Sequence, residues 1–322
     1  MPDIVIAFFA LGLLAGLVKS DLRVPESIYE TLSILLMLTL GLKGGMALHG
    51  QGDSLIIGEL VLIAALGLII PLALYPLLRR LIKLNRENAV SIAAHYGSVS
   101  AGTFAVVIAL AEHLDWPLKP ETTLYLVLLE LPAIIVMLWL YRFLNARKPL
   151  TQAATGTIKV SSGNILHEAL TSRGVILLTG GVAIGWAYGE SGLASLAPVL
   201  IGGFKTLLAL FLLEMGLCTA RVCRPLPLRQ WRLMLFAAVI PFVLAWGGIL
   251  LGLALGLPKG SILVLAGLAA SASYIAAPAA IRAAIPDANI GLAMLASLGI
   301  TFPINVLIGL PLYAQLIDMM QA

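Results

Sequence analysis

The amino-acid sequence predicts an all-α polytopic membrane protein, and three observations support that prediction. The 322-residue chain is 60% hydrophobic and only 11% charged, and its mean hydropathy is +1.03. Apolar runs of about 20 residues recur along it, which is the length a helix needs to cross the roughly 30 Å hydrocarbon core of a bilayer. A soluble domain needs a large polar exterior, so this composition excludes one.

Ten predicted spans form two sets of five, separated by the longest polar connection, residues 144–172. We expect residues 1–144 to form an N-terminal five-helix repeat, 145–172 a cytoplasmic linker, and 173–322 a C-terminal five-helix repeat. The first run lacks the basic segment of a signal peptide, so we interpret it as a retained span. The spans are expected near residues 3–18, 28–48, 55–79, 88–114, 121–143, 173–189, 200–220, 232–256, 260–284 and 290–316.

Basic side chains distinguish the two ends of this predicted bundle. All but four of the 20 lysines and arginines fall in or beside connections that follow odd-numbered spans. Because basic residues are enriched in cytoplasmic loops, these connections, including 144–172, should be cytoplasmic in a bacterial inner membrane. Both termini should then be periplasmic or outside. The net charge of +4 follows from this topology, and no nucleic-acid partner is expected.

The fourth span is interrupted by small polar residues at mid-depth, in the stretch HYGSVSAGTFA, residues 95–105. Backbone amides and carbonyls cannot be left unpaired in hydrocarbon. A break at this depth must therefore be buried in protein or line a watery cavity. Serine, glycine and threonine are also common where helices simply pack closely, so this stretch alone fits either role.

The ninth span carries a similar stretch at a corresponding position. AAHYGSVSAGTFA, from Ala93, aligns with GLAASASYIAAPA, from Gly267, to within one residue. At an offset of 173 residues, Ser98 falls on Ser271, and Ser100 falls on Ser273. Two interruptions at matching positions favour a substrate and ion site over ordinary packing.

Two further similarities support a repeat. Residues 25–48, PESIYETLSILLMLTLGLKGGMAL, resemble residues 198–221, PVLIGGFKTLLALFLLEMGLCTAR. Each break is followed by a proline inside the next span, in ELPA from Glu130 and in TFPI from Thr301. Because each half has an odd number of spans, related halves must have opposite orientations. The sequence thus predicts two inverted five-helix repeats, with broken helices 4 and 9 crossing at mid-membrane.

The two breaks are the candidate functional site. Half-helix N-termini attract an anion, whereas freed carbonyls and hydroxyls suit a hard cation such as sodium. An acidic side chain deep in a span, such as Glu130, is functional by default, although it is also explained as a satisfied structural acid. Candidate substrate-binding residues are Ser98, Ser100, Ala101, Gly102, Thr103, Ser271, Ala272, Ser273 and Tyr274, and candidate sodium ligands are Ser100, Thr103, Glu130, Ser271 and Ser273.

These stretches resemble the sodium-dependent bicarbonate transporter family, known from the cyanobacterial inorganic-carbon uptake protein, of which this chain looks like a divergent member. The resemblance runs through LGLKGGMAL, HYGSVSAGT, LLELPA, LAASASYIAAPAAIRAAIPDAN and TFPINVLIGLPLY. It implies ten spans in inverted repeats, bicarbonate and sodium bound where the breaks meet, and a homotrimer with an elevator-like movement. Sodium would be the coupling ion, with no organic cofactor. Some members are inhibited by a small cytosolic PII-like protein, so such a regulator is an expected partner.

The chain departs from the family's pattern at two places. The second break usually reads serine, serine, serine, aspartate, but the middle and last positions here are Ala272 and Tyr274. The aspartate before isoleucine-proline in the fifth span corresponds to Glu130. Losing one buried carboxylate changes both the ion count and the electrostatics, so the substrate, the coupling ion or both can differ. Tyr274 either caps the second break through its hydroxyl or fills the volume that an aspartate leaves.

Three functions remain in competition. The first is import of bicarbonate or a similar small anion with sodium. The second is transport of an organic anion, either a monocarboxylate or bile-acid-like, with sodium or protons on the same scaffold. The third, a membrane serine hydrolase using Ser98 or Ser100 with His95, lacks a G-x-S-x-G elbow and an acid partner, so no enzyme is expected.

Overall fold

The computed structural model describes residues 4–49, 57–146, 171, 173–224 and 228–321, and it is all-helical in these ranges. The all-α prediction is therefore confirmed for this part of the chain. The predicted linker, residues 145–172, lies almost entirely outside the described residues.

Seven helical segments of the described chain are long and apolar enough to cross a membrane. They match the second, third, fourth, fifth, seventh, eighth and tenth predicted spans. The other three predicted spans are represented by α1 (Ile4–Leu17), by α8 (Arg173–Leu193), and by the interrupted pair α12 (Lys259–Ala269) and α13 (Ala276–Ala284). The chain is thus a multi-pass membrane protein by length and composition.

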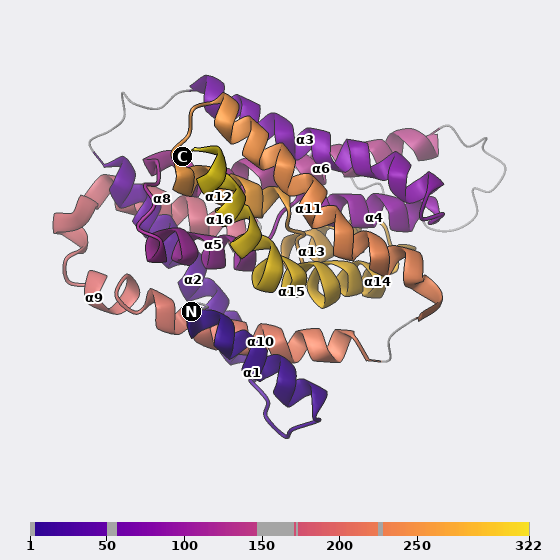
Figure 1. The fold of residues 1–322 in the computed structure, drawn as a ribbon, viewed down its shortest axis with the longest axis horizontal. Coiled ribbons are helices and arrows are strands. Elements are labelled where there is room, and N and C mark those ends of the chain that lie inside the picture. Colours follow the sequence, from indigo (N-terminus) through magenta and orange to yellow (C-terminus); the bar gives the residue numbers. More distant parts are fainter. Residues whose placement is uncertain (1–3, 50–56, 147–170, 172, 225–227, 322) are drawn as a thin grey trace.

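Four helices form what we call the flanking group: α1, α2 (Glu26–Leu48), α8 and α10 (Phe204–Val222). Within it α2 packs along α8, and α1 packs along α10 (Figure 1). Glycines permit these close approaches. A Cβ on Gly45 would lie 2.2 Å from the carbonyl oxygen of Val182, and one on Gly12 would lie 1.9 Å from that of Leu213. Small residues at such crossings let two backbones touch.

The remaining helices, apart from the short α9, form what we call the central group. In it α3 (Ile57–Arg80) packs on α6 (Tyr125–Ala146), and α11 (Trp231–Ala254) packs on α12. The short helix α9 (Ala197–Leu200) leads into α10. Two segments near the end, η4 (Leu295–Thr301) and η5 (Asn305–Gly309), have the wider turns of a π-helix on either side of Pro303. Proline has no backbone N–H to donate, and its ring crowds the preceding turn. The central group comprises α3 (Ile57–Arg80), α4 (Arg86–Gly97), α5 (Ala101–His113), η2 (Pro120–Leu124), α6 (Tyr125–Ala146), α11 (Trp231–Ala254), α12, α13, α14 (Ile290–Met294), η4 (Leu295–Thr301), α15 (Phe302–Ile304), η5 (Asn305–Gly309) and α16 (Leu310–Met320).

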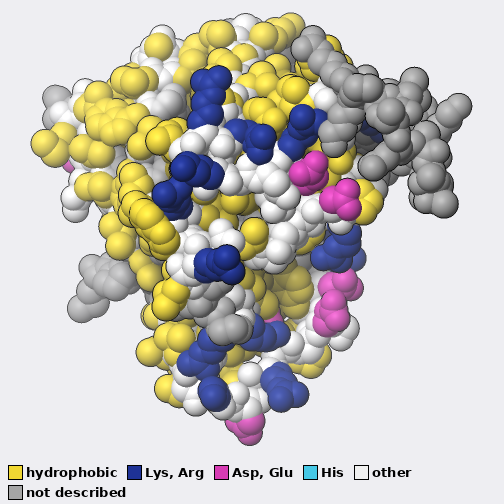
Figure 2. Space-filling view, turned by 90° about the vertical axis from the view of Figure 1, so that its right-hand side faces the viewer, with side chains coloured by type: hydrophobic (Ala, Val, Ile, Leu, Met, Phe, Trp, Pro, Cys, Tyr) yellow, Lys and Arg dark blue, Asp and Glu magenta, His cyan; other side chains and the backbone are white. Residues whose placement is uncertain are grey.

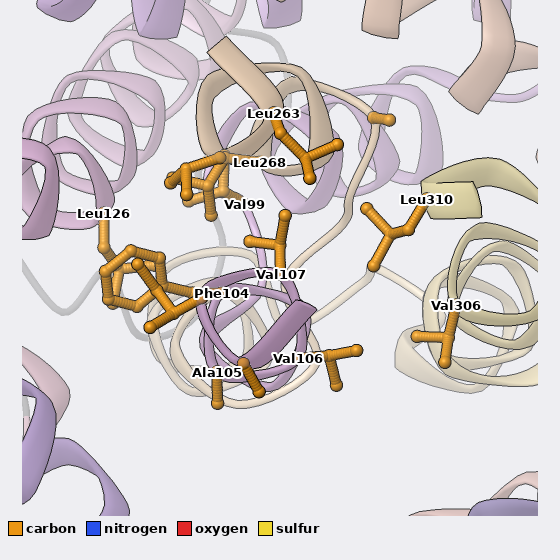
Figure 3. Packing of buried hydrophobic residues seen from close by; sticks show 14 of the residues in the cluster. Val99, Phe104, Ala105, Val106, Val107, Leu126, Leu263, Leu268, Val306 and Leu310 are labelled. Carbon is orange, nitrogen blue, oxygen red and sulfur yellow. The ribbon is translucent and has the colours of Figure 1, made fainter. Parts of the chain in front are cut away.

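Helix α5 lies in the middle of the larger hydrophobic core. Val107 is fully buried and points up from α5 towards Leu263, while Phe104 points sideways towards Leu126 (Figure 3). Helix α12 closes the core from above, through Leu263. Because α5 is enclosed on all sides, its first turn has a fixed position, and that turn begins at one of the two helix breaks.

Candidate binding site at two helix breaks

The first break separates α4 from α5 and consists of Ser98, Val99 and Ser100. Val99 has a φ of 44°, a left-handed conformation that is costly for a β-branched side chain. Ser100 caps the new helix, because its Oγ accepts a hydrogen bond of 3.1 Å from the amide of Thr103. The predicted interruption is therefore present, and its backbone is strained.

The second break separates α12 from α13 and spans residues 270–275. The Ser273 Oγ accepts a hydrogen bond of 3.2 Å from the amide of Ala277, and the Ser271 hydroxyl donates one of 2.7 Å to the carbonyl of Leu268. Pro278 lies in the first turn of α13, where a missing N–H costs nothing. Both ends of this break are thus stabilised by the chain's own hydroxyls and proline.

The two breaks are hydrogen-bonded to each other in both directions. The amide of Ser100 donates to the Ser271 Oγ at 2.8 Å, and the amide of Ser273 donates to the carbonyl oxygen of His95 at 2.7 Å. Each break therefore satisfies backbone or hydroxyl groups that the other leaves without a helical partner. Residues about 170 positions apart in the sequence (Ser100 and Ser271) meet at one place.

A cavity of about 670 Å³ extends from this meeting point. Five of the predicted site residues line it, namely Ser100, Ala101, Glu130, Ser273 and Tyr274. The other predicted residues are buried or nearly buried around the breaks, but they do not line the cavity; they are Ser98, Gly102, Thr103, Ser271 and Ala272. Half of the ten candidate residues therefore lie together at the inner end of this cavity.

Several polar atoms at the breaks are buried without a hydrogen-bond partner in the described residues. They include the Ser98 Oγ, the Thr103 Oγ1 and the Tyr274 hydroxyl. Buried polar atoms are nearly always satisfied in folded proteins, so a group of exceptions at one place suits a site that binds polar ligands.

Glu130 lies on α6 and faces the cavity, with only 6% of its surface exposed. Among the described residues it has no hydrogen bond or ion pair. A buried carboxylate in this setting needs a proton or a cation. It is therefore the side chain at the site best suited to ion binding.

The mouth of the cavity was not predicted from the sequence. It is formed by Glu26, Glu30 and Ser33 of α2 together with Arg173 and Arg282, and the Arg173 guanidinium lies 3.3 Å from a carboxylate oxygen of Glu30. The signal was present, because residues 26, 30 and 33 are polar and share one face of an otherwise apolar helix. Arg282, near the C-terminal end of α13, also lies in this mouth.

Other ionisable side chains within the helices have partners away from the cavity. Glu214 pairs with Arg221 at 2.8 Å, whereas Lys43 pairs with Glu112. His95 is fully buried, and its Nδ1 contacts the carbonyl of Ser91 at 2.7 Å. Its Nε2 and the Ser98 Oγ both lack a partner in the described chain, so they do not form a nucleophile–base pair. No group of three metal-binding side chains of the His, Cys, Asp or Glu type occurs among the described residues.

A multi-pass helical chain with two interrupted helices that meet beside a buried cavity has the layout of a secondary transporter. Residues 4–318 match the family model described as the Na⁺-dependent bicarbonate transporter superfamily, and the chain belongs to that family. A search of curated proteins finds no match.

Proposed function

We propose that the protein is a secondary active transporter that imports a small anion, bicarbonate first among the candidates, together with sodium. The observation that supports this best is the reciprocal pair of hydrogen bonds between the breaks, Ser100 to Ser271 and Ser273 to His95. It holds the first turn of α5 at the inner end of a cavity, where the partial positive charge of a helix N-terminus favours an anion.

Sodium coupling is supported by the oxygen atoms at the same place. Ser100 and Ser273 line the cavity with Glu130, and the unpartnered Thr103 hydroxyl lies one helical turn from Ser100. Hard cations prefer carboxylate, hydroxyl and carbonyl oxygens. We propose Ser100, Thr103, Glu130, Ser271 and Ser273 as the group from which the sodium ligands come.

Ten spans in two inverted five-helix repeats are part of the same proposal. In the flanking group, the first predicted span packs on the seventh and the second on the sixth. A two-fold axis that exchanges spans 1 with 6 and 2 with 7 converts the first of these contacts into the second. This reciprocity supports the repeat, with residues 1–144 and 173–322 as its halves and 145–172 as the linker.

The orientation we propose places the cavity mouth in the cytoplasm. Its charged residues, Glu26, Arg173 and Arg282, all belong to the predicted cytoplasmic ends of their helices. Figure 2 shows lysine and arginine side chains gathered over one face of the molecule, with fewer acidic ones. Basic residues are enriched on the cytoplasmic side of membrane proteins, so the cavity would be open for release into the cell.

An elevator-like movement of the central group against the flanking group would carry the site across the membrane. The division into two groups, each packed mainly on itself, supports such a movement. A homotrimer and a cytosolic PII-like regulator rest on the family resemblance and complete the proposal.

Uptake by the purified protein in proteoliposomes tests this function. Labelled bicarbonate should accumulate under an inward sodium gradient and stop accumulating when choline replaces sodium. Ser100→Ala should lower uptake at least ten-fold by removing both the helix cap and a site oxygen. Ser91→Ala, which removes a buried hydroxyl of α4 that does not line the cavity, is the matched control. Undiminished uptake without sodium would contradict the coupling.

Transport of an organic anion is the second candidate, and one observation favours it. The cavity of about 670 Å³ exceeds what a bicarbonate ion fills, since pockets of 300–1,000 Å³ commonly hold drug-sized ligands. Competition for uptake by bicarbonate, acetate, longer monocarboxylates and bile acids separates the two candidates. Stronger inhibition by an organic carboxylate than by unlabelled bicarbonate would select the second, and coupling to a pH gradient would identify the proton as its ion.

A further inference from the structure

Tyr274 lies between the inner end of the cavity and the first turn of α5. Its ring is held edge-on against Phe302, with ring centroids 5.4 Å apart and planes at 75°. Only 7% of the residue is exposed, and it lines the cavity beside Ser100 and Ala101. The ring is therefore fixed in a packed position, and the orientation of its hydroxyl is set by the fold.

The hydroxyl of Tyr274 lies directly against Gly102. A Cβ placed on Gly102 would be only 1.9 Å from this oxygen, so no larger residue fits at Gly102 without moving the tyrosine. Gly102 and Ala101 occupy the first turn of α5, whose amides have no carbonyl in a preceding turn to bond. The hydroxyl is thus placed at the first turn, the positive end, of a thirteen-residue helix.

This hydroxyl is buried and has no hydrogen-bond partner in the described residues. The Ser100 side chain lies close enough to interact with it but forms no hydrogen bond of standard geometry with it. A phenol is neutral, so the hydroxyl can donate to an anion without adding charge. The unpartnered hydroxyl is one feature and the N-terminus of α5 is another. Both favour the same ligand, a negatively charged oxygen.

We infer that Tyr274 determines specificity at the proposed anion site, because its hydroxyl donates to one oxygen of a small oxyanion and its ring limits the space beyond that oxygen. The substrate class is a single carboxylate or carbonate group with little attached to it. This inference rests on the proposed function, since it concerns the anion at the same site. The hydroxyl packs against Gly102, and Phe211 closes the same place from its other side, with its Cε1 3.2 Å from a Cβ on Gly102, so a bulky substituent next to the hydroxyl would collide there.

The test compares Tyr274→Phe with Tyr313→Phe in proteoliposomes. Tyr313 lies on α16, is 1% exposed and also carries a buried hydroxyl without a partner in the described chain, but it does not line the cavity. The two variants thus lose the same atom in similar surroundings. Tyr274→Phe should raise the KM for bicarbonate about ten-fold, as expected for a lost hydrogen bond to a charged group, whereas Tyr313→Phe should leave KM unchanged.

A second variant removes the dependence on a single substitution. Gly102→Ala should raise KM similarly, because its methyl group displaces the same hydroxyl. Combined with Tyr274→Phe it should add little, since both act on one interaction. Tyr274→Ala should extend inhibition from formate and acetate to longer carboxylates. Unchanged KM in Tyr274→Phe, or an equal rise in Tyr313→Phe, would overturn the inference.

Binding of bicarbonate in detergent separates this inference from the proposed function. If the wild-type protein is stabilised against heat by bicarbonate but does not transport it, the proposed function fails, and the inference stands only if Tyr274→Phe loses the stabilisation. If bicarbonate neither binds nor is transported, both fail.

Discussion

Glu130 is the residue on which ion coupling most depends. It is the one carboxylate among the predicted site residues, and it is buried on α6 with one face towards the cavity. Nearby acidic residues of the mouth, Glu26 and Glu30, lie on a different helix and are more exposed. The absence of a partner in the described chain is what distinguishes Glu130 from Glu214, a similarly buried acid that Arg221 neutralises.

We therefore expect Glu130→Gln to uncouple or abolish uptake. A glutamine keeps the shape but carries no negative charge, so the cation or proton that accompanies the anion loses its site. Uptake driven by a sodium gradient should fall at least ten-fold, while the melting temperature in detergent should stay equal or rise, because an unpaired buried charge is removed. Glu190→Gln on α8, which is exposed, is the control. Full sodium-driven uptake by Glu130→Gln would contradict this assignment.

How well the sequence predicted individual residues depended on how local their signal was. Ser100 and Ser273 were found because each lies in a short run of small polar residues that interrupts an apolar span, and the two runs fall at matching positions of the two halves. Glu26 and Arg282 were missed as parts of the site, since only the packing of α2 and α13 around the cavity gives them that position. Contacts between elements far apart in the chain leave no local pattern to read.

At the scale of the element, a polar cluster joins four helical segments, α3, η2, α6 and α12, through Lys119. The buried carboxylate of Glu59 on α3 accepts hydrogen bonds from Lys119 at 2.6 Å and from Tyr125 at 2.8 Å. Lys119 also lies 3.5 Å from Glu121, and its amide donates to the hydroxyl of Ser261 on α12 at 2.9 Å. The hydrogen bond to Glu59 raises the pKa of Lys119 above its usual 10.5.

Lys119→Met should therefore destabilise the protein without changing the KM for the anion. It leaves Glu59 buried with one partner instead of two, at a cost of about 1–3 kcal/mol. Because the pKa of Lys119 is raised, its contribution to stability is fully present below pH 10.5 and is lost only as the pH rises through the higher value. Melting in detergent should show a deficit that is constant between about pH 6 and 9. A deficit that varies across this range would refute the explanation.

Another ion pair connects the two groups of helices. Lys43 of α2, in the flanking group, pairs with Glu112 of α5, in the central group, and also lies 4.8 Å from the ring centroid of Phe204. Movement of one group past the other would have to break this contact. The pair is partly exposed, so its contribution is expected to be about 0.2–1 kcal/mol.

Removing this pair should alter the transport rate and leave anion affinity unchanged. Lys43→Gln and Glu112→Gln should each shift the maximal rate by up to about five-fold in the same direction, and the double variant should do no more than either one. The matched control is Lys259→Gln, which removes a 2.6 Å pair with Asp318 on α16 that lies within the central group. An equal rate change in this control would show that the Lys43 pair has no special role.

At the scale of the whole molecule, composition and the helix breaks were enough to predict an all-helical membrane protein with an internal site. Seven helical segments of the described chain are long and apolar enough to count as spans on their own; of the other predicted spans, α1 is short and α12–α13 is interrupted. The packing of α1 on α10 and of α2 on α8 could not be derived from either half alone. It depends on glycines that become informative only when the facing helix is known, as for Gly45 against Val182.

The direction of the whole molecule in the membrane follows from its basic face and can be measured directly. If that face is cytoplasmic, then Ser20, between α1 and α2, lies inside the cell, whereas His113, at the end of α5, lies outside; both are exposed. In a background with Cys218→Ser and Cys223→Ser, His113→Cys should react with a membrane-impermeant maleimide on intact cells. Ser20→Cys should react only after lysis. The opposite labelling would invert the topology and turn the cavity mouth, with Arg173 and Arg282, to the outside, so that the cavity in this conformation would admit the anion from outside instead of releasing it into the cytoplasm.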